Sequence, residues 1–258
     1  MNQFHEANRR GWDAVSAMWQ AKVEIEGKWR RCHQEPQLAL AGEELRFLRD
    51  VRGKAACVLG SGDNLVAFAL AGLGAQVTSV DISQAQLDAA ARRAGELGLI
   101  IRFVRADVTD LAELADETFD VVYTGGHVAV WVSNLALYCH EACRILKRGG
   151  LFLVSEYHPF RRIWKPNTER IEPEFGYFDR GPVQYDRAED TGGAVAGPLP
   201  SYEFHWTVGD YVTALLAAGC ELLSLQEFGV GRQDWETAPL EGLPESLLLL
   251  GRRRDGCR

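Results

Sequence analysis

Short apolar runs alternate with segments whose apolar residues recur every three or four positions, and this alternation fills the middle of the chain. The runs typical of buried strands are Ala55–Gly60, Ala75–Val80, Ile100–Arg105, Phe119–Tyr123 and Leu151–Glu156. The segments with helical spacing are Leu65–Leu73, Ser83 to about Leu97, and Trp131–Leu146. Strands that alternate with helices predict a parallel sheet with helices on both faces.

The two ends of the chain depart from that alternation. Before the first strand, Asn2–Gln20 and Glu35–Val51 predict two helices. After a helix at Thr207–Ala218, strands are predicted at Glu221–Glu227 and Glu245–Arg252, with no helix-length pattern between them. These last two strands could pair as an antiparallel hairpin, whereas a two-halved dinucleotide fold would need another crossover helix.

The segment 157–206, after the fifth strand, breaks the pattern because it holds six of the nine prolines and no clean helical period. An irregular segment of this length in a compact domain is usually a lid, a binding loop or disorder. Its many aromatic residues argue against disorder. Within it, Ser201–Trp206 alternates as a strand with one aromatic face. A cover over a substrate and a small satellite core both remain open.

The composition narrows the possible partners. The formal net charge of −8 argues against a nucleic-acid backbone as the main partner. No run approaches the ~18 apolar residues of a membrane helix, and the first ten residues lack the apolar core of a signal peptide. The six cysteines have no disulfide or zinc spacing, so we expect a reducing cytoplasm and no metal site. Cys139 and Cys143 favour burial in an apolar core.

A glycine turn after the first strand carries the strongest functional signal. Gly60 and Gly62 let a backbone approach a ligand closely, and the next helix starts at Asp63–Leu65 with its N–H groups directed at that position. Asp81 lies 21 residues after Gly60, at the end of the next strand, where a carboxylate can accept hydrogen bonds from ribose hydroxyls. We therefore predict a nucleoside site. Leu65, where dinucleotide enzymes need a small residue, argues against a dinucleotide.

This turn resembles the G-x-G-x-G motif of class I S-adenosylmethionine-dependent methyltransferases, with Asn64 in place of the last glycine. The resemblance extends over about Lys54–Arg252. Its other motifs are Val80-Asp81-Ile82-Ser83, Ala106-Asp107-Val108, Phe119 to Thr124, and Arg144 to Val154. It implies an α/β, Rossmann-like, doubly wound, seven-stranded and mostly parallel sheet with an antiparallel last strand and a lid insertion after strand five.

The resemblance also implies a division of the chain and a cosubstrate, S-adenosyl-L-methionine. Residues 1–53 are expected to form an N-terminal helical cover, residues 54–156 and 207–258 the cosubstrate-binding core, and residues 157–206 the substrate-covering insertion. Asp81 is expected to bind the ribose, Asp107 the adenine amine and Val108 the adenine ring. The full expected set is Gly60, Ser61, Gly62, Asn64, Asp81, Ile82, Asp107, Val108, Thr124 and Gly125. Purely structural roles, a tight turn for the glycines and helix or turn capping for Asp81 and Asp107, stay open.

The expected reaction is methyl transfer to a small-molecule acceptor by in-line displacement, which needs an aligned nucleophile. Candidate bases follow strands four and five: His127, Glu156 and His158, of which we select His127 and His158 because histidine suits proton transfer at neutral pH. Each histidine could instead be a hydrogen-bonded wall. The residues expected to contact the acceptor are Trp19, Tyr157, Tyr202 and His205.

Three other functions compete with this one. The first is a non-catalytic protein on the same fold that binds S-adenosylmethionine or S-adenosylhomocysteine. The second is a nicotinamide oxidoreductase, which Leu65 disfavours. The third is a nucleic-acid methyltransferase, which would carry Asn/Asp-Pro-Pro-Tyr/Phe after strand four, where this chain has Thr124-Gly-Gly-His127. We expect a monomer or homodimer. The acceptor, and whether oxygen, nitrogen or carbon receives the methyl group, stay open.

Overall fold

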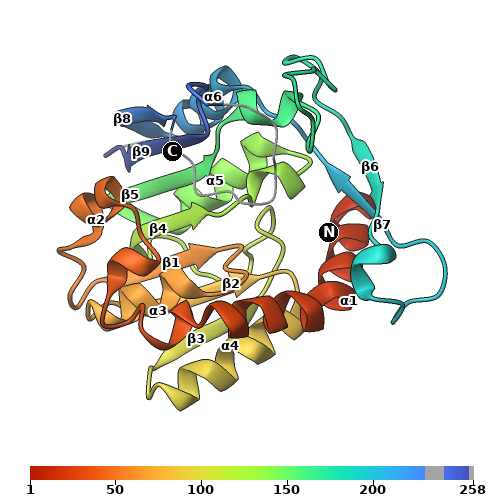
Figure 1. Ribbon diagram of the computed structural model, residues 1–258. Helices are drawn as coiled ribbons and strands as arrows, with labels where there is room; N and C mark the ends of the chain where they lie inside the picture. The colour runs from red at the N-terminus through yellow and green to blue at the C-terminus, as the bar shows by residue number, and fades with distance from the viewer. Residues whose placement is uncertain (230–240, 256–258) are drawn as a thin grey trace.

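The computed structural model describes residues 1–229 and 241–255, and its centre is one seven-stranded sheet in the order β3-β2-β1-β4-β5-β9-β8 (Figure 1). The strands are β1 Ala55–Leu59, β2 Gln76–Asp81, β3 Ile101–Arg105, β4 Phe119–Gly125, β5 Leu146–Tyr157, β8 Cys220–Phe228 and β9 Ser246–Arg253. Strands β1 to β5 are parallel, and β9 runs antiparallel to both β5 and β8. The predicted mostly parallel sheet with an antiparallel last strand is confirmed. The middle of the connection between β8 and β9 lies outside the described residues.

Helices cover both faces of this sheet, as the alternation of elements predicts. They are α2 Gly42–Leu48, α3 Leu65–Gly72, α4 Gln84–Glu96, α5 Leu135–Ile145 and α6 Val208–Ala217. Alternate side chains of β1 point to opposite layers: Cys57 and Leu59 pack with α5 and α6, and Ala56 and Val58 pack with α2 and α3. This division is typical of a parallel sheet that is buried on both faces.

Four of the six cysteines contribute to the apolar core on one face of the sheet. Cys57, Cys139, Cys143 and Cys220 are buried free thiols in one apolar cluster, and the Sγ atoms of Cys143 and Cys220 lie 3.5 Å apart. The prediction that Cys139 and Cys143 are buried in an apolar core is confirmed. Among the described residues, no helix is long and apolar enough to cross a membrane.

The first helix is longer than the sequence pattern predicts. Helix α1 covers Gln3–Glu26 rather than Asn2–Gln20, and it begins at an Asn2 side chain that accepts hydrogen bonds from the backbone of Phe4 and His5. It continues to Gly27, which ends it in the left-handed conformation that glycine adopts at no steric cost. Helix α1 packs against α4 and against the insertion (Figure 1).

Two other predicted helices are wrong at their ends, in each case because a side chain starts a new helix inside the predicted span. Glu35–Val51 is broken into a short 3-10 turn and α2, because the Glu44 carboxylate accepts a hydrogen bond from the backbone N–H of Ala41. The helix predicted at Trp131–Leu146 also begins later than expected. A 3-10 turn at Ala129–Trp131 precedes it, and α5 starts only at Leu135. Here Asn134 accepts a hydrogen bond from the backbone of Leu137 and caps the helix.

The insertion after β5 contains a second, two-stranded antiparallel sheet, β6 Val183–Asp186 with β7 Pro200–Glu203. The predicted strand Ser201–Trp206 is therefore shorter than expected. Its aromatic face packs on α1: the ring centroid of Phe4 lies 5.1 Å from that of Tyr202 and 5.6 Å from that of Phe204. This face thus forms a small satellite core, as the alternative interpretation predicts. Other residues of the insertion line a cavity.

Candidate active site

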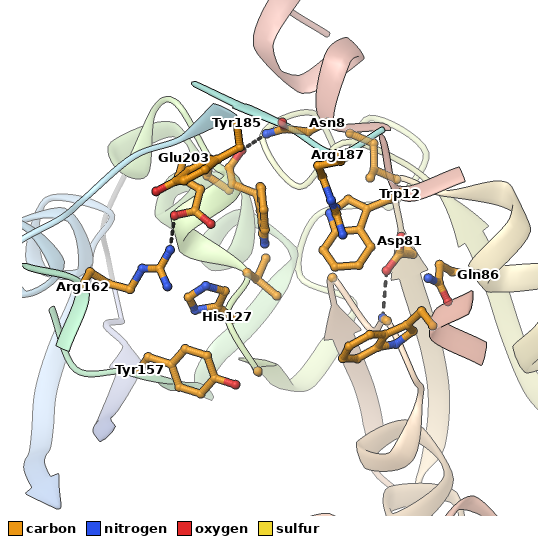
Figure 2. A pocket seen from close by; sticks show the side chains of 18 of the residues that line it. Asn8, Trp12, Asp81, Gln86, His127, Tyr157, Arg162, Tyr185, Arg187 and Glu203 are labelled. Carbon is orange, nitrogen blue, oxygen red and sulfur yellow. Dashed lines mark hydrogen bonds and ion pairs between the residues drawn. The ribbon is translucent and has the colours of Figure 1, made fainter. Parts of the chain in front are cut away.

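A cavity of about 800 Å³ lies where β1, β2, β3 and β4 end, between α1 and the insertion. Figure 2 shows two sides of it, with Asp81 and Gln86 on one side and His127, Tyr157 and Arg162 on the other. The structure brings these expected residues together in its lining: Trp19, Gly60, Ser61, Gly62, Asp81, Ile82, Asp107, Val108, Gly125, His127 and Tyr157. Segments from four parallel strands meet here because their carboxyl ends share one edge of the sheet.

The glycine turn lines this cavity and packs closely against Val128. Gly60 and Gly62 have φ of 60° and 49°, in the left-handed region. A Cβ atom on Gly60 would lie 2.5 Å from a methyl carbon of Val128, so only glycine fits against that side chain. Four N–H groups of this turn already have acceptors within the protein: Ser61, Gly62, Asn64 and Leu65 donate to Val80, Asp81, Ser61 and Asp63.

The side chain of Asn64 holds the turn through hydrogen bonds. It adopts the left-handed conformation with φ of 63°, which asparagine tolerates better than most residues. Its side-chain amide donates to the carbonyl of Gly62 over 2.9 Å and accepts from the Ser79 hydroxyl over 2.6 Å. Asn64 is buried and lies outside the cavity lining. It replaces the last glycine of the motif by fixing the turn through hydrogen bonds.

Asp81 is held at the end of β2 by two backbone groups. One carboxylate oxygen accepts from the N–H of Gly62 over 2.8 Å, and the other from the N–H of Ser83 over 2.9 Å. The Ser83 hydroxyl, and not Asp81, caps α4 by accepting from Gln86. Burial raises the pKa of Asp81. Each carboxylate oxygen has two lone pairs and uses one of them for a backbone N–H. Both oxygens of Asp81 can therefore accept one further hydrogen bond from a ligand.

Asp107 has a partner that the sequence analysis missed. Nδ1 of His5, on the first turn of α1, lies 2.7 Å from one carboxylate oxygen of Asp107, and both residues are buried. Nε2 of His5 accepts from the backbone N–H of Ser133, so Nδ1 carries the proton. Burial acts to raise the pKa of Asp107, but the hydrogen bonds from His5 and Thr109 lower it below its usual value. The carboxylate therefore stays ionised, as an acceptor.

Tryptophans line the wall that α1 contributes. Trp12 lies edge-on to Trp19, with centroids 6.2 Å apart, and to Trp131, with centroids 5.5 Å apart. All three rings line the cavity. Trp29, which also stood out in the sequence, is buried in a separate cluster with Phe68 and does not line it. Helix α1 thus closes the cavity mainly with apolar ring surface.

His127 lies on the loop after β4 with φ of 81°, an uncommon value for a residue with a side chain. Its ring centroid is 4.4 Å from that of Tyr157 and 6.2 Å from that of Trp131. Burial, helped by the nearby Arg162, lowers the pKa of His127 to about 3. The imidazole is therefore neutral at physiological pH, and it is a weaker base than an ordinary histidine.

Glu156 holds the loop that carries His127. Its carboxylate accepts hydrogen bonds from the backbone N–H groups of Val128 and Ala129, both over 3.0 Å. Burial raises the pKa of Glu156 to about 7. The side chain is 3 % exposed and does not line the cavity, so it shapes the loop rather than meeting a substrate.

The structure leaves five expected site residues outside the cavity lining. They are Asn64, Thr124, His158, Tyr202 and His205. Thr124 accepts from the Tyr138 hydroxyl in the core, and Tyr202 packs on Phe4. His158 has both ring nitrogens engaged: Nε2 lies 2.7 Å from Glu227, and Nδ1 accepts from the N–H of Phe160. His127 is therefore the one selected base that reaches the cavity.

Charged residues of the insertion form a wall that sequence reasoning missed, because no periodic pattern marks them. Arg162 pairs with Glu203, and Arg161 lies 2.6 Å from Glu245. Arg187 extends between Trp12 and His127 (Figure 2). In the part of the chain that the structure describes, no three His, Cys, Asp or Glu side chains could jointly hold a metal ion.

The sequence of this chain is similar to those of known methyltransferases. Residues 57–154 match the family model described as a methyltransferase domain. The chain is 30 % identical over 168 residues to the uncharacterized methyltransferase YbaJ of Bacillus subtilis, and 26 % identical over 165 residues to a ubiquinone biosynthesis O-methyltransferase of Methylobacterium sp. (strain 4-46). Each match covers 60 % of this chain and 66 % of the relative, just under two thirds of its length.

A solved structure gives the same fold. The S-adenosylmethionine-dependent methyltransferase from Mesorhizobium loti aligns with a TM-score of 0.61 and 24 % sequence identity, over 83 % of this chain and 99 % of that one. At this identity the likeness concerns the fold alone.

Proposed function

Because the chain belongs to the class I S-adenosylmethionine-dependent methyltransferase family, we propose that it binds S-adenosylmethionine where β1, β2 and β3 end and transfers the methyl group to a small molecule. The observation that carries the proposal is the single cavity that joins Asp81 and Asp107 to the wall around His127. A cosubstrate and an acceptor can therefore meet inside it. The cytoplasmic location and the small-molecule partner are parts of the same proposal.

The residues on one side of the cavity fit a nucleoside. Gly60 and Gly62 present backbone without side chains at the cavity wall, so a ligand can approach that backbone closely. Asp81 would accept from the ribose hydroxyls, and Asp107, held by His5, would accept from the adenine amine. Ile82 and Val108 supply apolar surface for the ring.

The sulfonium group of the cosubstrate supplies an electrophilic methyl group. The chain has to orient the acceptor and exclude water. Trp12, Trp19 and Trp131 enclose the site with apolar rings. His127 is neutral above pH of about 3 and can accept a hydrogen bond from the acceptor. We propose that it orients the acceptor, because so low a pKa makes it a weak base.

We propose that an oxygen atom of the acceptor receives the methyl group. Several curated relatives carry the name ubiquinone biosynthesis O-methyltransferase, at 23–29 % identity. An acceptor hydroxyl can donate a hydrogen bond to the neutral imidazole of His127. This hydrogen bond fixes the direction of the lone pairs on the hydroxyl oxygen.

The proposal is tested in two steps. Calorimetric titration with S-adenosylhomocysteine should give saturable binding that Asp81→Ala weakens. Labelled S-adenosylmethionine and a metabolite extract should then give labelled product. Binding without turnover would favour the non-catalytic alternative, and no binding to the folded protein would contradict both functions.

A further inference from the structure

We propose that the methyl acceptor carries a carboxylate or similar planar anionic group and that Arg187 binds this group. The inference rests on the proposed function and adds the substrate class. Arg187 lies on the segment after β6 and lines the cavity. Figure 2 shows its guanidinium between the side of the cavity that holds Asp81 and the side that holds His127 and Arg162.

Arg187 is the least neutralised of the three arginines in the cavity wall. Arg161 pairs with Glu245, and Arg162 with Glu203, and the side chains of these two carboxylates are 17 % and 8 % exposed. Arg187 pairs instead with Asp190, whose side chain is 51 % exposed. Ion pairs with exposed partners contribute little because water screens them.

The contacts of Arg187 leave one edge of its guanidinium for a ligand. Nε lies 3.2 Å from Asp190. Among the described residues, neither terminal nitrogen donates to an oxygen, and Nη1 is buried without a hydrogen-bond partner. A buried donor without a partner is costly. The edge formed by the two terminal nitrogens matches a carboxylate, which accepts two parallel hydrogen bonds from it.

Aromatic rings hold this guanidinium in place before any ligand binds. Its central carbon lies 4.3 Å from the ring centroid of Trp12 and 5.6 Å from that of Trp131. An arginine fixed in this way loses little rotamer freedom on binding.

The rest of this side of the cavity selects a planar body. Four further aromatic rings from β5 and the insertion line it: Tyr157, Trp164, Phe175 and Tyr185. Flat aromatic surfaces beside one arginine whose terminal nitrogens have no carboxylate partner among the described residues suit a ring that bears an acidic substituent. His127, between Trp131 and Tyr157, would meet a hydroxyl on the same ring.

The test compares two probes of nearly equal size, 4-hydroxybenzoate and its uncharged counterpart 4-hydroxybenzamide. Each is titrated into the protein saturated with S-adenosylhomocysteine. We expect the acid to bind at least about tenfold more tightly than the amide. Arg187→Gln should abolish that preference, Arg187→Lys should retain part of it, and the remote Arg252→Gln should leave it intact. Equal affinities, undetectable binding of both probes, or a preference that survives Arg187→Gln would overturn the proposal.

A second arm identifies which molecule supplies the anion. S-adenosylhomocysteine has a carboxylate of its own, whereas 5′-methylthioadenosine has none. We expect Arg187→Gln to bind both nucleosides as the unaltered protein does, which would leave the proposed cosubstrate site intact whatever the acid probe shows. A loss of affinity for S-adenosylhomocysteine alone would assign Arg187 to the cosubstrate and overturn the acceptor proposal.

Discussion

At the scale of single residues, the two acids of the cosubstrate side differ in how they are held. Asp81 is fixed by backbone N–H groups of its own strand-end region, Gly62 and Ser83. Asp107 depends on His5, 102 residues earlier in the chain. The first environment forms between neighbouring strand ends, whereas the second arises only when α1 docks.

Asp81→Ala should weaken binding of S-adenosylhomocysteine by about 10–150-fold, the range for losing hydrogen bonds to a charged group. The carboxylate also fixes the N–H of Gly62, so part of the loss comes from the turn. Titration calorimetry measures the change, with the exposed Asp88→Ala on α4 as the matched control. Unchanged affinity in a folded Asp81→Ala protein would remove Asp81 from the site.

His127→Gln should lower turnover by about tenfold, less than the 10²–10⁴-fold expected for a positioned general base. Because burial lowers its pKa to about 3, His127 stays neutral from weakly acidic to alkaline pH. The rate of the unaltered protein should therefore show no limb near the ordinary histidine pKa of ~6.5 that His127→Gln removes, whereas a limb from Glu156 would persist in that variant. The exposed His140→Gln is the control. A larger loss, together with such a limb, would make His127 a base.

At the scale of elements, α1 contacts two parts of the cavity wall. His5 pairs with Asp107 after β3, and Asn8 pairs with Tyr202 of the insertion. The Asn8 amide donates to the carbonyl of Tyr202 over 2.9 Å and accepts from its N–H over 2.7 Å, so it pairs with β7 as a neighbouring strand would. Asp13, farther along the same helix, accepts from the Ser83 hydroxyl over 2.6 Å. Helix α1 thus connects the insertion to the ends of β2 and β3.

His5→Ala should reduce the affinity for S-adenosylhomocysteine by about three- to tenfold and blunt the preference for adenine over hypoxanthine. The reason is that Asp107 loses the donor that holds its carboxylate in place. Comparing S-adenosylhomocysteine with S-inosylhomocysteine measures the preference, which a general loss of stability would not change. Arg10→Ala, exposed on the same helix, is the control. An unaltered ratio of the two affinities would show that His5 serves only to dock α1.

Sequence reasoning predicted those elements whose signals are local. Ser83 caps α4 as predicted, and the five parallel strands overlap the apolar runs that predicted them, because burial on both faces requires such runs. Strand β5, however, begins at Leu146 rather than at the predicted Leu151. Helix boundaries failed where a capping side chain inside the predicted span, Glu44 or Asn134, starts a new helix, because the spacing of apolar residues does not mark such caps. Arg187 reaches the cavity only through the pairing of β6 with β7, which no period in the segment predicted.

At the scale of the whole molecule, buried titratable groups make the free energy of unfolding depend on pH. Burial raises the pKa of Glu156 from 4.5 to about 7. A raised pKa in the folded state means that the folded chain binds more protons than the unfolded chain between these values. The contribution of Glu156 is complete below the lower value and is lost as the pH rises through the upper one.

Glu156→Gln should therefore gain stability over the unaltered protein as the pH rises from about 5 to 8, by about 3 kcal/mol at most. The glutamine oxygen can still accept from Val128 and Ala129, so the loop keeps its hydrogen bonds. Denaturant unfolding at several pH values gives the difference. A constant difference across this range would mean that Glu156 keeps an ordinary pKa.

The pairing of Asn8 with β7 constrains which segments of this chain could be replaced by those of a relative. Asn8 and Tyr202 lie 194 residues apart in the chain, and the Asn8 amide can make both hydrogen bonds only in one register of β7. A chimera that takes residues 157–206 from a relative while keeping this α1 would bring a foreign strand to Asn8. Acceptor preference should therefore transfer between relatives only when both segments are grafted together, and single-segment chimeras should lose it.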